Sequence, residues 1–140
     1  GADCASEVPR VEMRFGDTKT IDLVAGGGIP DGWMGLDVGT KTAALFNDIL
    51  STATKLVFNG PMGVFEIKPF DEGTKAMVDT LAALTGKGCI TVVGGGDSVA
   101  ALEAFGKTKA VAYVSTGGGA TLELLAGAVL PGVAAIADFE

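Results

Sequence analysis

The sequence contains no histidine among its 140 residues. Histidine is the commonest general base near neutral pH and the commonest metal ligand in proteins. Its absence disfavours most hydrolase mechanisms.

Cysteine is also scarce, with only Cys4 and Cys89. The two residues have neither metal-ligand spacing nor a CxxC pattern, and Cys89 begins an apolar run typical of a buried strand. We interpret both as free thiols in a reducing compartment.

Positively charged residues are fewer than negatively charged ones. Lys and Arg number 10 against 17 Asp and Glu, which gives a formal charge of -7. This balance disfavours a general nucleic-acid or anionic-membrane surface. It does not exclude a phosphate ligand, because backbone amides bind phosphate without net positive charge.

Long apolar runs are absent. The longest uncharged stretch, 124–137, is interrupted by Gly127 and by Pro131-Gly132, so we predict no membrane span. The first residues are neither basic nor followed by an apolar stretch, unlike a signal peptide. We expect a cytoplasmic protein, with a plastid or another organelle as the alternative.

Hydrophobic residues and glycine are abundant. Hydrophobic residues make up 48% of the chain and the mean hydropathy is +0.44, which suits one small domain with its own core. The 22 glycines cluster at the ends of apolar runs without a collagen-like period.

Predicted strands alternate with predicted helices. The expected strands are 55–58, 89–93 and 110–114, and the expected helices are 42–53, 71–84, the segment up to Gly106, and 120–126. Gly86 and Gly127 would follow helix ends. Helical spacing predicts one apolar face on the first helix (Leu45, Phe46, Ile49, Leu50 and Ala53) and inward faces on the second (Met77, Val78, Leu81 and Leu84) and on the last (Leu122 and Leu125). Because the strands are almost continuously apolar, we predict an α/β fold with a parallel sheet and helices on both faces.

The segment 1–28 differs from the rest. Residues 10–15 and 21–25 alternate between polar and apolar on either side of Gly16–Lys19, which is typical of a hairpin or edge ribbon. Gly26–Gly28 is interpreted as a loop. The single tryptophan, Trp33, is expected to pack beneath the loop that follows.

Three predicted strands end in unusual turns: Asn59–Gly63, Gly94–Ser98 and Thr116–Gly119. In an open parallel sheet all strand carboxyl ends lie at one edge, where ligands bind. Glycine lets a ligand approach the backbone closely, and the first turn of a helix offers free amides to phosphate. We therefore predict that the three turns converge on one phosphate site.

Alternatives remain for individual residues. By sequence alone Asp97 is either a helix N-cap or a metal ligand near phosphates. Glu66 by itself would be an ordinary surface carboxylate, and Gly117–Gly119 an ordinary turn.

Several motifs together resemble those of phosphoglycerate kinases. They are Ile29–Asp37 (IPDGWMGLD), Asn59–Glu66 (NGPMGVFE), Gly94–Ser98 (GGGDS) and Ser115–Ala120 (STGGGA), with Leu122–Leu125 and Leu130–Val133 in addition. The resemblance spans roughly residues 29–137 and is weak over 1–28. Thr40 and Phe58 stand where the family usually has proline and often has tryptophan.

The resemblance implies a two-domain kinase of glycolysis that transfers a phosphoryl group between 1,3-bisphosphoglycerate and Mg-ADP, giving 3-phosphoglycerate and ATP. It places residues 29–140 in the later part of the C-terminal, nucleotide-binding domain. The chain would then form a Rossmann-like sheet that is about half of a doubly wound domain. The phosphoglycerate-binding domain would lie outside this chain, so we expect no activity from the chain alone.

The same resemblance assigns nucleotide contacts. Gly35 and Leu36 would line the adenine pocket, Asn59 would lie near ribose and phosphates, and Glu66 would accept hydrogen bonds from ribose hydroxyls. The nucleotide phosphates would meet Gly95, Gly96, Asp97 and Ser98, with Mg²⁺ at Asp97, and Gly117, Gly118 and Gly119 would offer amides to the transferring phosphoryl group.

Two other functions fit the residues. The chain could be a non-catalytic structural subunit, or the complement of a separate half of the kinase, because half a sheet leaves an apolar edge and face exposed. It could also be a mononucleotide-binding module of another function.

Overall fold

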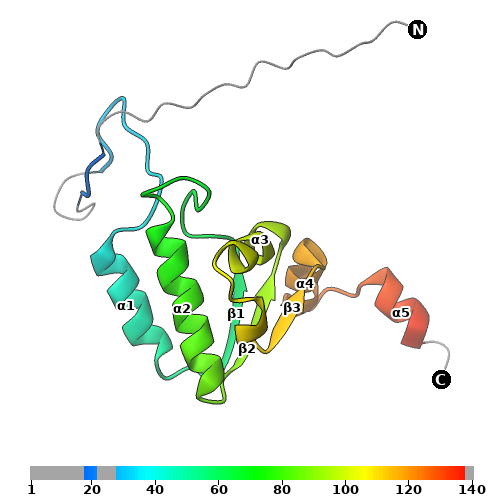
Figure 1. Cartoon of the computed structure of the whole chain (residues 1–140). Coiled ribbons are helices and arrows are strands. Elements are labelled where there is room, and N and C mark those ends of the chain that lie inside the picture. The colour runs from blue at the N-terminus through cyan, green and yellow to red at the C-terminus, as the bar shows by residue number, and fades with distance from the viewer. Residues whose placement is uncertain (1–17, 22–27, 138–140) are drawn as a thin grey trace, which may run out of the picture.

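The computed structural model describes residues 18–21 and 28–137, and Figure 1 shows the arrangement. Most of the predicted hairpin lies outside the described residues. The elements are α1 (Thr40–Leu50), β1 (Lys55–Asn59), α2 (Glu72–Gly86), β2 (Ile90–Gly94), α3 (Gly96–Ala104), the short 3₁₀ helix η1 (Thr108–Ala110), β3 (Tyr113–Ser115), α4 (Gly118–Leu125) and α5 (Pro131–Ala137).

The strands form a parallel sheet in the order β1-β2-β3. Phe58 pairs with Val93, and Val93 pairs with Val114. Successive parallel strands joined by right-handed crossovers place both connecting helices on one face. Accordingly α2 and α3 both contribute to the core on that face.

The core lies between the sheet and these two helices. The buried hydrophobic cluster is Leu56, Phe58, Met77, Val78, Leu81, Leu84, Cys89, Val93, Leu102 and Val111. The predicted inward face of α2, from Met77 to Leu84, is confirmed, since these side chains recur at helical spacing. Cys89 is a buried free thiol, also as predicted.

The opposite face of the sheet is open. Val57, Ile90 and Tyr113 expose 44%, 45% and 64% of their surface there. The predicted α/β class with an open parallel sheet is confirmed, but in the described part of the chain the connecting helices cover one face.

Two helices bury less than the sequence predicts. Phe46 and Leu50 of α1 pack against the core, but Leu45 and Ile49 are 55% and 63% exposed. In Figure 1, α1 lies along the flank of α2. The apolar face predicted for this helix is therefore only partly buried.

Helix α4 follows the last strand, and its expected inward residues Leu122 and Leu125 are 47% and 61% exposed. That prediction was wrong, because α4 follows the edge strand β3 and contributes no side chain to the core cluster. Helix α5 begins with Pro131, which is favourable at a first helical position, and it stands apart from the sheet (Figure 1).

Glycines end the helices as left-handed residues. Gly106 and Gly127, with φ of 65° and 86°, follow α3 and α4 as predicted. For α2 the glycine is Gly88, with φ of 92°, and not Gly86, which stays within the helix. Cys89 N–H donates to Leu84 O and Gly88 N–H to Thr85 O, the bonds of a Schellman motif that needs glycine at this position.

Two local predictions differ from the structure. The segment expected to form a strand from residue 110 begins as η1, and β3 starts only at Tyr113. Trp33 is 41% exposed, and Lys19 Nζ lies 4.2 Å from its ring centroid. Trp33 is therefore a surface residue partly covered by a cation, not a residue buried beneath its loop.

Candidate functional site

The three turns at the strand ends lie side by side at one edge of the sheet. Asn59 pairs with Gly94 at the ends of β1 and β2, and Gly94 pairs with Ser115 at the end of β3. A Cβ placed on Gly118 would lie 3.9 Å from Gly95 Cα. The predicted convergence is confirmed, because parallel register carries all three carboxyl ends to the same level.

Gly95 fits closely between its neighbours at the start of α3. Its φ is 90°, a region that disfavours side chains, and a Cβ would lie 3.0 Å from Asn59 Oδ1. Gly96, by contrast, would meet nothing within 4 Å. Gly95 therefore allows the turn, and Gly96 leaves the first amides of α3 approachable by a ligand.

Ser98 is fully buried beneath this edge. Its Oγ accepts a hydrogen bond of 2.7 Å from Gly60 N–H. The hydroxyl therefore joins the first turn of α3 to the loop after β1. Because no part of Ser98 is exposed, the residue supports this edge from beneath and does not form its surface.

Asp97 lies in the first turn of α3 and is exposed. Gly95 occupies the N-cap position, and no side-chain cap bond is formed, so the N-cap interpretation of Asp97 was wrong. The carboxylate is near the positive end of the helix dipole.

The side chains at this edge of the sheet suit Mg²⁺, which needs few protein ligands, better than a metal ion that is coordinated by protein side chains alone. Among the described residues no three Asp, Glu, His or Cys side chains come together as a metal site. Mg²⁺ commonly binds through one or two carboxylates together with substrate phosphates and water. A single carboxylate in the first turn of a helix, beside the amides at its start, fits that pattern.

The loop after β3 is fixed by its own hydroxyls. Ser115 Oγ and Thr121 Oγ1 lie 2.9 Å apart, and Gly117 N–H donates to Ser115 Oγ at 3.2 Å. Gly118, with φ of 42°, begins α4, and Gly119 has open space around it. The amide of Gly117 thus holds the turn, whereas Gly118 and Gly119 belong to the first turn of a helix at the edge.

Gly35, Leu36 and Glu66 belong to a second region, beside the start of α2. Val64 N–H donates to Leu36 O at 3.0 Å, which ties the segment containing Gly35 to the loop containing Glu66. Glu66 is exposed. The structure thus brings the residues expected at adenine and ribose into adjoining backbone segments.

Two residues that organise this region were missed. Thr74 is fully buried, and its Oγ1 accepts hydrogen bonds from Met62 N–H and Gly63 N–H at 3.1 and 3.2 Å. Asp37 Oδ2 accepts a hydrogen bond from Gly73 N–H at 2.7 Å, across 36 residues. Sequence spacing carries no signal for such distant pairs.

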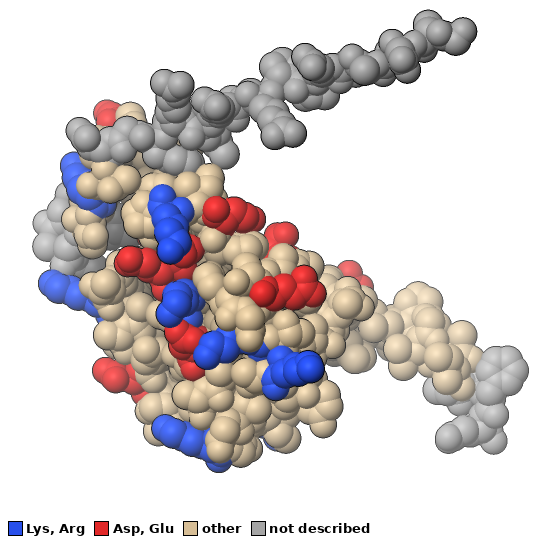
Figure 2. Space-filling model, in the orientation of Figure 1, with Lys and Arg blue, Asp and Glu red and all other residues tan. Residues whose placement is uncertain are grey.

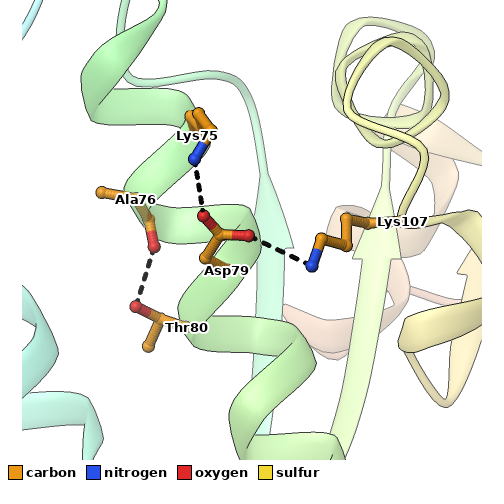
Figure 3. A network of polar contacts seen from close by, with 5 residues as sticks. All are labelled: Lys75, Ala76, Asp79, Thr80 and Lys107. Carbon is orange, nitrogen blue, oxygen red and sulfur yellow. Dashed lines mark hydrogen bonds and ion pairs between the residues drawn. The ribbon is translucent and has the colours of Figure 1, made fainter.

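A charged network lies along α2 (Figure 3). Asp79 contacts Lys75 Nζ at 3.0 Å and Lys107 Nζ at 3.4 Å. The hydrogen bond from Lys75 is the largest influence and, with Lys107, lowers the pKa of Asp79 despite the opposing effect of partial burial. The network joins α2 to the loop after α3.

The face of the molecule in Figure 2 interleaves lysines with acidic side chains. No helix among residues 18–21 and 28–137 is both long and apolar enough to cross a bilayer.

Comparison with known proteins identifies phosphoglycerate kinases as relatives. The family model described as phosphoglycerate kinase matches residues 7–128. The phosphoglycerate kinase of Parasynechococcus marenigrum is 57% identical over 122 residues, covering 87% of this chain and 30% of that protein. The chloroplastic enzyme of Chlamydomonas reinhardtii is 55% identical over 120 residues, covering 86% of this chain and 25% of that protein.

Solved structures agree. The phosphoglycerate kinase of Coxiella burnetii superposes with a TM-score of 0.62 at 45% identity, covering 67% of this chain and 24% of that one. The enzyme of Pyrococcus horikoshii gives 0.58 at 41% identity, covering 69% and 23%. The chain spans less than a third of the length of these relatives, and it belongs to the phosphoglycerate kinase family.

Proposed function

We propose that this chain forms part of the nucleotide site of a phosphoglycerate kinase, which transfers a phosphoryl group reversibly between 1,3-bisphosphoglycerate and Mg-ADP. The observation that carries the proposal is the meeting of three strand-end turns, at Asn59, Gly95 and Gly118, at one edge of the sheet. Family membership supports it.

We assign different parts of the nucleotide to different residues along that edge. The amides of Gly95 and Gly96 face the nucleotide phosphates, and Ser98 supports them from beneath through its bond to Gly60. Gly118 and Gly119 offer amides to the transferring phosphoryl group. Gly117 shapes the turn through Ser115. Gly35 and Leu36 lie at the adenine, with Asn59 and Glu66 near the ribose.

This set of groups suits phosphoryl transfer. The reaction depends mainly on in-line positioning and on stabilising charge at the phosphoryl oxygens, and less on a strong base. Amides fixed at strand and helix ends provide such positioning without histidine. Mg²⁺ bound at Asp97 would neutralise phosphate charge.

A second candidate is a non-catalytic unit that complements the rest of a kinase fold. The open sheet face, with Val57, Ile90 and Tyr113 exposed, favours it. The partner would be the remainder of the kinase or a larger assembly. A folded, monodisperse monomer in analytical ultracentrifugation would argue against this candidate.

The test of the first proposal is calorimetric titration of the chain with Mg-ADP. We expect binding that weakens about ten-fold or more in Asp97→Ala, as for loss of a charged contact. Asp48→Ala is the control, because Asp48 is an exposed acidic residue on α1. A chain that is folded by circular dichroism and binds no Mg-ADP would contradict the proposal that these turns suffice for a site.

A further inference from the structure

The Asp37 carboxylate joins two segments that are distant in sequence. Its Oδ2 accepts a hydrogen bond from Gly73 N–H at 2.7 Å, and its Oδ1 accepts one from Val38 N–H at 2.8 Å. Gly73 is the second residue of α2. The carboxylate therefore accepts a hydrogen bond from the first turn of this 15-residue helix, where the helix dipole favours negative charge.

Two glycines make room for this carboxylate. A Cβ on either Gly63 or Gly73 would overlap Asp37 Oδ1. The carboxylate thus lies between the loop after β1 and the start of α2, in a space that any larger residue at these positions would fill.

The backbone on both sides is tied down as well. Leu36, next to Asp37, accepts the bond from Val64 N–H. Thr74, next to Gly73, accepts from Met62 N–H and Gly63 N–H. Segment 35–37 and loop 60–66 are therefore both attached to the first turn of α2.

We propose that Asp37 is a positioning residue for the base and ribose side of the nucleotide site. It does not touch the nucleotide itself. By holding segment 35–37 against α2 and loop 60–66, it sets Gly35 and Leu36 opposite the loop that contains Glu66. The inference rests on the proposed function, in which these residues meet adenine and ribose.

The phosphate side depends on different contacts. There Ser98 bonds to Gly60 and the glycine turns pack around Asn59. Loss of the Asp37 carboxylate should therefore affect ligands with a nucleoside more than ligands that are phosphate alone. This selectivity separates positioning from a general loss of stability, which would weaken both ligands.

The first experiment compares Mg-ADP and Mg-pyrophosphate affinities by calorimetry in the wild-type chain, Asp37→Ala, Asp37→Asn and Asp79→Ala. We expect Asp37→Ala to lose about ten-fold in Mg-ADP affinity, as for a charged hydrogen bond, with an unchanged pyrophosphate affinity. Asp37→Asn should lie between, since its amide keeps one acceptor oxygen. Asp79→Ala is the matched control, a two-partner carboxylate six residues beyond Gly73 along α2, and should leave both affinities unchanged.

Equal losses for both ligands in Asp37→Ala, or no loss for Mg-ADP, would overturn the inference. If the wild-type chain binds neither ligand, the proposed function fails, and amide hydrogen exchange then decides the role of Asp37 separately. Asp37→Ala should speed exchange at Val64 N–H and leave Val93 N–H in the central strand unchanged. Unchanged exchange at Val64, or equal acceleration at both amides, would overturn the positioning role.

Discussion

At the scale of single residues, Ser98 shows how a motif residue can act from beneath a site. Its side chain is fully buried and accepts from Gly60 N–H at 2.7 Å. In Ser98→Ala this amide loses its partner, and we expect the free energy of unfolding to fall by about 1–3 kcal/mol. Urea denaturation measures the change.

Ser51→Ala is the control for this substitution, because Ser51 Oγ donates to Asp48 O on an exposed surface. We expect a change within about 0.5 kcal/mol. Equal stability of Ser98→Ala and the wild-type chain would show that the buried bond contributes nothing.

Asp79 makes stability depend on pH. Lys75, and with it Lys107, lowers the pKa of Asp79 from its ordinary value of 3.8. A carboxyl with a lowered pKa in the folded state stabilises the fold above its ordinary pKa, and this contribution disappears as the pH falls through the lowered value. Because all three side chains are 40–58% exposed, the effect should stay below about 1 kcal/mol and weaken with salt.

Denaturation of the wild-type chain and Asp79→Asn between about pH 2.5 and pH 7 tests this, across the range in which an aspartate titrates. The stability difference should be constant near neutral pH and vanish at the acid end. A difference that grows as the pH falls would have the wrong sign for this network.

At the scale of elements, two glycines in α2 should respond oppositely to alanine. Alanine is favoured over glycine within helices by about 1 kcal/mol. At Gly73, however, a Cβ would overlap the Asp37 carboxylate, and we expect a net loss of about 1–3 kcal/mol. At Gly86 nothing lies within 4 Å of the added Cβ, so the stability should rise by up to about 1 kcal/mol.

Thermal unfolding of both variants measures whether each substitution lowers or raises the stability of the fold. A Gly73→Ala chain more stable than the wild type would show that Asp37 moves away without cost. It would also mean that close packing around the Asp37 carboxylate does not hold segment 35–37 against α2.

At the scale of the whole molecule, the chain spans 30% of a bacterial relative and leaves one sheet face open. We predict that the purified chain has no phosphoglycerate kinase turnover, because phosphoryl transfer requires both substrates to be held in line and the proposed site here provides the nucleotide side. A coupled assay for ATP formation measures this. Turnover above a buffer control, and lost in Asp97→Ala, would contradict it.

The amino-acid sequence by itself determined the class of fold and the parts of the site that are local in the chain. Apolar runs alternating with helical patterns indicated a parallel sheet, and turns beginning at Asn59, Gly94 and Thr116 marked its ligand edge. Parallel topology is enough to bring these turns together, because all strands end at one edge. The left-handed glycine that follows α2 was predicted at Gly86 and lies at Gly88, since the local pattern does not distinguish the two glycines.

Only the tertiary structure decided the contacts between distant segments. It placed the Ser98 hydroxyl beneath Gly60 and the Asp37 carboxylate against Gly73, and it left Leu122 and Leu125 of α4 exposed. The physical reason is that burial and hydrogen-bond partners depend on which elements pack together. Helical or strand periodicity fixes a residue's face, but not whether another element covers it.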